Sequence, residues 1–283
     1  MSLLPDFSQI VVRRHKDVLF VTLNRPQTRN ALAPEMVAEL AHVIDMAKTD
    51  GTLRALVLRG AGGFFCAGGS IGNFRARLEA ETTGEDPVAT RNREFGHFME
   101  RFSAFPLPVI AVVEGGAFGG GFGLACAADL VLATTDARFS LSETTLGIIP
   151  AQIAPFVVAR LGAAKTRRLG LTGEHIAGTT AVAIGLVDSC AADAEGLDAL
   201  LAAWLTRIGR CAPGANSTFK RLVSACSGGE DTATVLDGAA LLFAQCMREE
   251  GAEGTAAFRE KRPAAWVQAF DAEDVRLPVP STA

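Results

Sequence analysis

The chain has 283 residues, of which 49% are hydrophobic and 20% are charged. This balance is typical of a globular protein, and the length suits one large domain or one domain with an appendage. The formal net charge of -4 gives no general attraction to nucleic acid or anionic lipid, because both bind clustered lysine and arginine. We therefore expect neither a nucleic-acid partner nor a membrane partner.

Targeting signals are not evident in the sequence. Residues 1–17 lack the charged head and long apolar stretch of a signal peptide. The uncharged run at residues 115–128 is rich in glycine and shorter than the ~18 residues of a membrane span. We expect a soluble, cytoplasmic protein.

Six cysteines are scattered along the chain without a C-x-x-C pair or a matching cluster with histidine. This spacing predicts neither a disulfide framework nor a zinc site, so we expect no metal. We expect the cysteines to be small buried hydrophobic residues. They are Cys66, Cys126, Cys190, Cys211, Cys226 and Cys246.

The first elements predicted along the chain are a hairpin and a helix. β-branched and aromatic residues crowd residues 10–14 and 18–23, which we expect to pair as two strands. Pro34 suits the first turn of a helix. Apolar residues follow Pro34 at helical spacing, namely Met36, Leu40 and Ile44.

A strand, a loop and a helix then recur three times. The strands are predicted at residues 55–58, 109–113 and 130–133. The first helix is expected to end near Phe105, the second to begin at residues 124–127 and the third to begin near Ala154. The first two loops are rich in glycine, and the third contains "FSLSETTLGIIP". This repetition favours an α/β fold with parallel strands, in which functional groups gather in the loops at strand ends.

The C-terminal part has a helical pattern of its own. We place the boundary at residue 211, which gives a core of residues 1–211 and a helical region of residues 212–283. One helix is predicted from an apolar stripe and another over residues 253–262. The tail from about Asp271 is expected to be loose. The stripe consists of Leu236, Ala240, Phe243 and Met247.

The segment Gly68-x-Ser70-x-Gly72 has the spacing of a hydrolase nucleophile elbow. That motif requires a strand directly before the serine, and an acid and a histidine later in the chain. Glycine-rich residues 62–67 precede Ser70, and the two histidines that follow it, His97 and His175, each stand alone. A serine nucleophile is therefore disfavoured.

The glycine loops can instead supply exposed backbone N–H groups. Residues 119–123 fit neither standard phosphate-binding motif, so a nucleotide site is not predicted. Glycine lets the main chain approach a ligand closely, and the second loop leads into a helix N-terminus with partial positive charge. Two converging N–H groups would form an oxyanion hole, although such glycines can also serve tight turns alone.

An enolate held in an oxyanion hole also requires a group that carries a proton. Glu143 lies in the otherwise apolar third loop. It is either a solvated loop residue or a partly desolvated acid/base with a raised pKa, and the sequence leaves both open.

Five segments together resemble the enoyl-CoA hydratase/isomerase (crotonase) superfamily. They are "VTLNRPQTRNAL", "FFCAGGSI", "VEGGAFGGGFGLACAADLVLA", "FSLSETTLGIIP" and "AAFREKR", and the similarity covers about residues 10–265. The resemblance implies a spiral of repeated ββα units with a small helical C-terminal trimerisation region. It also implies a homotrimer or a dimer of trimers, and an acyl-CoA substrate. Coenzyme A is part of this substrate, so no separate cofactor is expected.

The family pattern assigns roles to particular residues. Gly69 and Gly120 would donate the two oxyanion N–H groups, and Ser70 stands where many members have Asp. The segment 67–71 would face the adenine of coenzyme A, and Arg29, close to Ala31, would contact phosphate. Phe243 and Lys261 would reach a coenzyme A moiety of the same or the adjacent subunit. The adenine segment includes Ala67, Ser70 and Ile71.

One departure from the family pattern bears on the reaction. Well-known hydratases carry one Glu three residues beyond the middle glycine and a second in the later loop, and this chain has Gly123 and Glu143 at those positions. A single Glu at the second position resembles the pattern in delta-3 to delta-2 enoyl-CoA isomerases. However, "GFGL" with "LGIIPAQIAPFVVARLG" looks more like methylglutaconyl-CoA and isohexenylglutaconyl-CoA hydratases.

We therefore expect an enzyme that hydrates a branched, glutaconyl-type 2-enoyl-CoA, with Glu143 as acid/base and open space at Gly123 for the acyl group. The alternatives are isomerisation, decarboxylation or thioester hydrolysis on the same oxyanion hole, or a non-catalytic acyl-CoA-binding or RNA-binding relative. The acidic charge balance disfavours RNA binding, and Glu143 disfavours inactivity.

Overall fold

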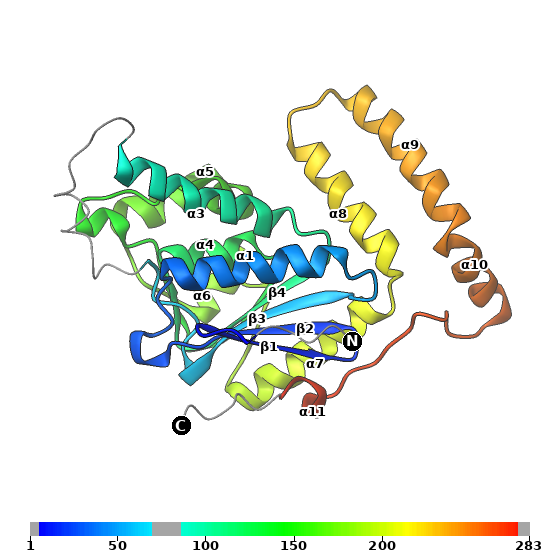
Figure 1. Cartoon of the computed structure of the whole chain (residues 1–283), viewed down its shortest axis with the longest axis horizontal. Coiled ribbons are helices and arrows are strands. Elements are labelled where there is room, and N and C mark those ends of the chain that lie inside the picture. The colour runs from blue at the N-terminus through cyan, green and yellow to red at the C-terminus, as the bar shows by residue number, and fades with distance from the viewer. Residues whose placement is uncertain (1–5, 70–85, 277–283) are drawn as a thin grey trace.

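The computed structural model of the chain describes residues 6–69 and 86–276. Two β-sheets form its centre, and helices pack around them (Figure 1). Within the described residues, no helix is both long enough and apolar enough to span a membrane.

The larger sheet has six strands in the order β1-β2-β3-β4-β6-β9. Strands β1 and β2 form an antiparallel hairpin with Ile10 opposite Leu23, and every later pair in the sheet is parallel. The predicted hairpin and parallel strands are therefore confirmed. In sheet order the strands are Ile10–His15, Val18–Leu23, Ala55–Gly60, Val109–Val113, Leu130–Thr134 and Ser189–Ala191.

A smaller sheet of three strands was not predicted from the residues themselves. It contains β5 (Gly116–Phe118), β7 (Arg138–Ser140) and β8 (Ile176–Ala177) in that order. Strand β5 lies inside the segment where we expected a glycine loop. It pairs in parallel with β7, from Gly116 opposite Arg138 to Phe118 opposite Ser140. The second strand of the ββα unit is thus too short and too rich in glycine to give a strand pattern.

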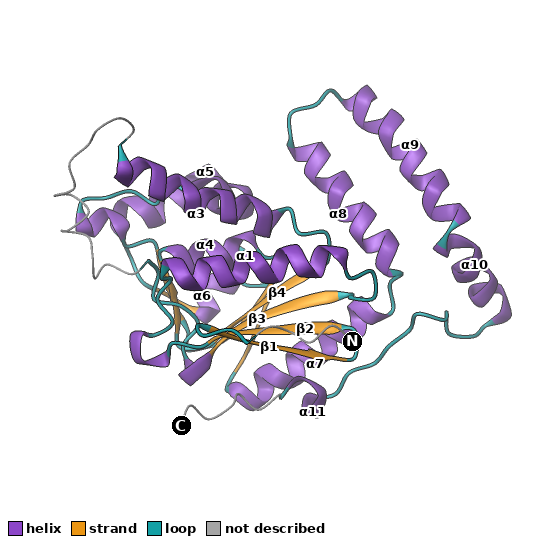
Figure 2. Cartoon of the chain, viewed as in Figure 1, coloured by secondary structure: helices purple, strands orange, loops and turns teal. Residues whose placement is uncertain are grey.

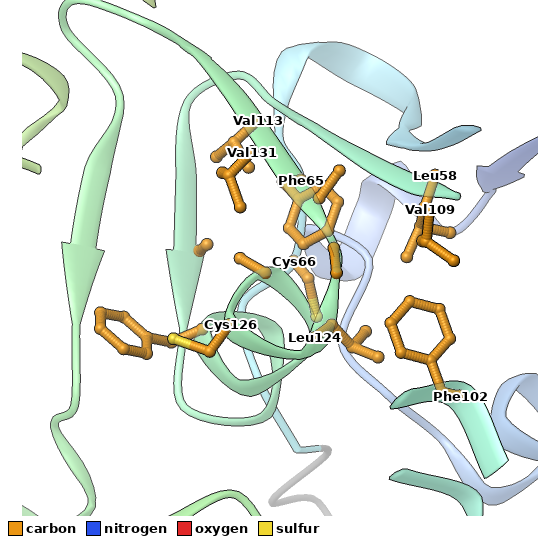
Figure 3. Close-up of a cluster of buried hydrophobic side chains, with 14 of the residues drawn as sticks. Leu58, Phe65, Cys66, Phe102, Val109, Val113, Leu124, Cys126 and Val131 are labelled. Atoms are coloured by element: carbon orange, nitrogen blue, oxygen red, sulfur yellow. The ribbon is translucent and has the colours of Figure 1, made fainter. Parts of the chain in front are cut away.

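Alternate residues of the central strands enter two separate cores. Leu56 and Leu58 of β3 belong to a large cluster with helices on one face, whereas Ala55 and Val57 pack in a smaller cluster on the other face. This division follows from the two-residue period of a strand. Figure 3 shows part of the larger cluster, in which side chains from strands and helices are interleaved.

The helices divide accordingly between the two faces (Figure 2). The larger cluster takes residues from α1, α3, α4, α5 and α6, and the smaller one from α7 and α11. The first group is α1 (Pro34–Thr49), α3 (Pro87–Ser103), α4 (Gly120–Ala127), α5 (Ala154–Thr172) and α6 (Gly178–Ile184). The second is α7 (Ala194–Gly209) and α11 (Ala272–Val275). The predicted α/β fold is confirmed.

Three C-terminal helices project away from the sheets (Figure 1). They are α8 (Pro213–Ser227), α9 (Thr232–Arg248) and α10 (Glu250–Glu260), so the two predicted C-terminal helices exist. Large apolar side chains on these helices are exposed, including Leu241 at 75% and Phe258 at 87%. The boundary at residue 211 stays a prediction, although α8 begins just after it.

Two expectations about individual residues are wrong. Residues 271–276, expected to be loose, are ordered, because Asp271 caps α11 with a capping box and Asp274 is bound by His15 and Lys16. These long-range contacts hold α11 on the body of the molecule. The rest of the tail lies outside the described residues. Cys211 and Cys226 are exposed, not buried.

Candidate active site

The first glycine loop runs from the end of β3 to Gly69 and is attached to the segment that follows β4. Phe65 N donates a hydrogen bond to Glu114 O at 2.9 Å, and Cys66 N donates to Gly116 O at 3.1 Å. Phe118 N donates to Cys66 O at 2.9 Å. The backbone of this loop therefore continues the parallel pairing of β3 with β4 up to the second glycine loop.

Asn30 holds the first loop from its other side. Its side chain is fully buried, and Nδ2 donates to Ala61 O at 2.9 Å and to Phe64 O at 2.6 Å. Its Oδ1 accepts from Arg25 N at 2.8 Å. A buried side-chain amide with these bonds fixes backbone groups that regular structure leaves unpaired. Asn30 was not singled out from the sequence, so this role was missed.

Arg29 and Ala31 border the same loop. Arg29 O accepts a hydrogen bond from Ala67 N at 2.9 Å, and Leu32 N donates to Gly68 O at 2.7 Å. The Arg29 side chain is exposed, and its guanidinium lies 5.7 Å from the centroid of the Phe64 ring. Of the positions predicted to contact coenzyme A, Arg29, Ala31 and Ala67 are thus gathered along one edge of the loop.

The second glycine loop differs in detail from the prediction. Helix α4 begins at Gly120, not at residue 124, so Gly120 is the first residue of the helix. Gly119 has a φ of 48° and a ψ of -119°, a conformation that favours glycine. The first hydrogen bond of the helix runs from Gly123 N to Gly119 O at 3.0 Å. Gly120 N is therefore one of the unpaired N–H groups of a helix N-terminus.

The two glycine loops meet at Gly69 and Gly120. A Cβ built on Gly68 would lie 3.5 Å from Gly120 N, and a Cβ built on Gly120 would lie 3.8 Å from Gly69 N. Among the described residues, no carbonyl or side chain accepts a hydrogen bond from either N–H. Two unpaired backbone donors from separate loops therefore lie side by side.

Glu143 lies beside these donors. It begins the short 3₁₀ helix Glu143–Leu146, and its Oε1 is 3.1 Å from the position that a Cβ on Gly119 would occupy. Its Oε2 is buried without a hydrogen-bond partner in the described part of the chain. Burial raises the pKa of the Glu143 carboxyl above its usual value. Glu143 is therefore partly desolvated and not a solvated loop residue, and its acid/base role stays a prediction.

Cys66 and His97 are not placed to act as catalytic residues. The Cys66 side chain is fully buried, and this burial raises the pKa of its thiol to about 12. His97 lies exposed on α3 beside Glu100, with 3.4 Å between Nδ1 and a carboxylate oxygen. Within residues 6–69 and 86–276, no group of three or more His, Cys, Asp or Glu side chains is placed to hold a metal ion.

Known proteins resemble this chain over most of its length. The sequence model of a family described as "Enoyl-CoA hydratase/isomerase" matches residues 13–269. The chain belongs to the enoyl-CoA hydratase/isomerase family.

Two solved structures and one curated protein illustrate the similarity. An enoyl-CoA hydratase/isomerase from Marinobacter aquaeolei is 43% identical with a TM-score of 0.88, and the match covers 92% of this chain and 99% of that one. Pseudomonas aeruginosa AtuE is 46% identical with the same TM-score of 0.88, and the match covers 92% and 100% of the two chains. The 2,3-dehydroadipyl-CoA hydratase of Escherichia coli strain K12 is 36% identical over 181 residues, which are 64% of this chain and 68% of that protein.

In this member of the enoyl-CoA hydratase/isomerase family, the space beside Gly123 is filled. A Cβ built on Gly123 would lie 2.6 Å from Ile153 Cβ and would overlap Ile153 Cγ2. Ile153 is only 3% exposed. The expectation that Gly123 leaves room for a branched or charged acyl group is therefore wrong. The glycine serves close packing of α4 against the segment before α5.

Several predicted contacts are not brought together in one chain. Phe243 lies on α9, where its side chain is 69% exposed, and Lys261 follows α10. Both helices lie on the projecting C-terminal part, away from α4 (Figure 1). Ser70 and Ile71 lie outside the described residues. The roles of these four residues stay predictions.

Proposed function

We propose that this protein adds water to a 2-enoyl-CoA thioester, and that its substrate is of the branched glutaconyl type. The observation that carries the proposal is the position of Glu143 beside two N–H donors, those of Gly69 and Gly120, which have no acceptor among the described residues. A thioester oxygen that accepts from both donors becomes an enolate oxygen when a nucleophile adds to the carbon–carbon double bond. Each such donor contributes about 10² to 10³ in rate.

The proposed reaction uses one carboxylate for both proton transfers. Glu143 takes a proton from water as the water oxygen bonds to the third carbon of the acyl group, and the enolate forms on the thioester oxygen. The protonated Glu143 then gives that proton to the second carbon, and the enolate returns to a thioester. One O–H bond of water and the π bond between the second and third carbons are broken, and one C–O bond and one C–H bond are formed. The raised pKa of Glu143 suits a group that must both accept and release a proton.

Fewer observations support the glutaconyl type of substrate than support hydration itself. The "PAQIAPF" segment resembles that of hydratases for glutaconyl thioesters, and the similar Escherichia coli protein is named for a dehydroadipyl thioester. Both acyl groups end in a second carboxylate. The filled space at Gly123 means that this carboxylate needs a place elsewhere in the site.

A second candidate reaction is isomerisation of a 3-enoyl-CoA to a 2-enoyl-CoA. Ile153 occupies the space where a second acid at position 123 would project, whereas Glu143 places a carboxylate beside Gly119. One base is sufficient to move one proton between two carbons of the same acyl chain. A water molecule is not required for this reaction.

Enoyl absorbance separates the candidates. The purified protein is mixed with 3-methylglutaconyl-CoA, glutaconyl-CoA, crotonyl-CoA and a 3-enoyl-CoA. Hydration removes the conjugated absorbance of the 2-enoyl thioesters, whereas isomerisation creates it from the 3-enoyl thioester. Loss of absorbance that disappears in Glu143→Gln supports hydration. No change with any 2-enoyl-CoA refutes it, and unchanged turnover in Glu143→Gln refutes the role of that residue.

Assembly and location stay predictions of the same kind. We propose a homotrimer or a dimer of trimers in the cytoplasm, in which the exposed apolar residues of α8 to α10 are covered by neighbouring subunits. Light scattering of the purified protein distinguishes three, six and one subunits.

A further inference from the structure

Helix α3 contacts the region of the proposed oxyanion donors through Phe95, and it carries polar groups within one turn of that residue. Phe95 of α3 has its Cζ 3.5 Å from the position that a Cβ on Gly120 would occupy. Asn92 lies almost one helical turn before Phe95, and its Oδ1 accepts a hydrogen bond from Gln152 Nε2 at 2.8 Å. Gln152 is followed directly by Ile153, which packs on Gly123. The hydrogen bond between Asn92 and Gln152 therefore connects the helix that carries Phe95 with the segment that carries Ile153, and both of these apolar residues pack on the first turn of α4.

Gly96 creates space for two of these polar groups. A Cβ built on Gly96 would overlap Gln152 Oε1 and would lie 2.5 Å from Arg93 Nη1. Glycine inside a helix is less favourable than alanine, so a buried glycine here indicates a need for close approach. The Gln152 amide and the Arg93 guanidinium thus lie together over the backbone of α3.

Arg93 retains binding capacity at this position. Its Nη2 donates to Glu100 Oε1 at 2.7 Å, and both side chains are partly exposed, at 46% and 57%. Among the described residues, Arg93 Nη1 and Asn92 Nδ2 donate to no acceptor, and Gln152 Nε2 has a second hydrogen beyond its bond to Asn92. Three donor groups, one of them charged, are therefore available in one cluster.

We propose that Arg93, Asn92 and Gln152 bind the distal carboxylate of a dicarboxylic acyl-CoA. Guanidinium and amide N–H groups are matched donors for a carboxylate, and a charged donor makes the hydrogen bond stronger. The acyl chain would leave the donors Gly69 and Gly120 past Phe95, because Ile153 blocks the direction of Gly123. This inference rests on the proposed function and names the residues that select its substrate.

Binding of saturated analogues tests the inference without any reaction. Glutaryl-CoA carries the distal carboxylate, and butyryl-CoA lacks it. Calorimetry gives the Kd of both for the wild-type protein, for Arg93→Gln and for Arg93→Lys. Arg101→Gln is the matched control, because Arg101 lies on the same helix and pairs with Asp45 of α1 instead. A melting curve of each variant shows that it is folded.

The expected result is a change in the ratio of the two affinities. Arg93→Gln weakens glutaryl-CoA at least about tenfold more than butyryl-CoA, because a charge-assisted hydrogen bond is lost. Arg93→Lys retains part of the preference, and Arg101→Gln retains all of it. Gln152→Glu also lowers the preference, because it places a negative charge beside the ligand carboxylate.

Two outcomes overturn the inference. One is a wild-type protein that binds both analogues equally, and the other is an Arg93→Gln protein that keeps the wild-type ratio. Neither depends on turnover, so a protein that hydrates crotonyl-CoA but ignores the distal carboxylate retains the hydratase function and loses only this inference. Absence of turnover with every enoyl-CoA, together with a preference for glutaryl-CoA that Arg93→Gln removes, refutes the reaction and leaves the binding site.

Discussion

Replacing Gly120 by alanine separates the proposed catalytic role of the glycine loops from their structural role. The added methyl group would lie 3.8 Å from Gly69 N, on the side of Gly120 that faces the other donor. A thioester oxygen bonded to both N–H groups must occupy this region at a normal hydrogen-bond distance. The methyl group therefore displaces the oxygen from at least one donor.

The expected loss of activity is large. Removal of one oxyanion donor costs about 10² to 10³ in kcat, equivalent to about 2.7–4 kcal/mol of transition-state stabilisation. A displacement of about 1 Å within the site can by itself cost about 10² in rate. We expect kcat with crotonyl-CoA to fall by about 10² or more in Gly120→Ala.

The expected effect on folding is small. The added Cβ would lie 2.9 Å from Leu32 Cδ1, the end of a flexible side chain, and 3.5 Å from Phe95 Cζ. Moving one leucine away from its best rotamer costs about 0.5–1.5 kcal/mol. Replacing glycine by alanine where the backbone conformation suits alanine also stabilises a protein by about 0.4–1 kcal/mol, because it restricts the unfolded chain. The two effects oppose each other, so the unfolding free energy should change by less than about 1 kcal/mol.

The assay is a parallel measurement of kcat and of urea unfolding for wild type and Gly120→Ala. A folded variant with kcat within about threefold of wild type would refute the placement of the thioester oxygen between Gly69 and Gly120. A large loss of folding stability would refute the packing argument at Leu32.

Three other changes test separate parts of the structure. Because burial raises the pKa of Glu143, kcat/KM should fall with decreasing pH, with a midpoint above pH 4.5. For the same reason, Glu143→Gln should raise Tm at pH 7. This advantage should be lost below pH 4.5, where the wild-type carboxyl is protonated in both the folded and the unfolded state. Gly123→Ala should destabilise the fold by about 1–3 kcal/mol in urea unfolding, because rotation of the Ile153 side chain cannot move its Cβ away from the new methyl group. The control Gly170→Ala, with no neighbour within 4 Å, should be neutral or stabilising by up to about 1 kcal/mol. Equal effects of the two substitutions would contradict the packing at Ile153. Burial opposes ionisation of Asp274, but hydrogen bonds to its carboxylate outweigh this effect and hold its pKa below 3.8. Asp274→Asn should therefore lower Tm at pH 7, and the difference in Tm from wild type should shrink as the pH falls below 3.8. A difference in Tm that does not depend on pH would contradict this ion-pair role.

Local patterns were sufficient to predict most of the main elements. Residues 109–113 are five consecutive apolar residues, and β4 has the predicted bounds because a strand buried on both faces has no other pattern. Helix α1 begins at Pro34 as predicted, since proline suits the first turn and apolar residues follow at helical spacing. Strand β5 and the start of α4 at Gly120 were not predicted, because glycine gives no periodic signal.

The sequence by itself determined the α/β fold, the family resemblance, and the two glycine loops with Glu143 as candidates, because these depend on residue type and spacing along the chain. Tertiary structure decided how those candidates combine. Gly69 and Gly120 are 51 residues apart in the sequence and meet through the parallel pairing of β3 and β4. Whether Glu143 is desolvated, and whether Gly123 leaves a gap, depends on side chains packed from other parts of the chain. Sequence spacing cannot report such contacts, because burial and packing are set by neighbours in space.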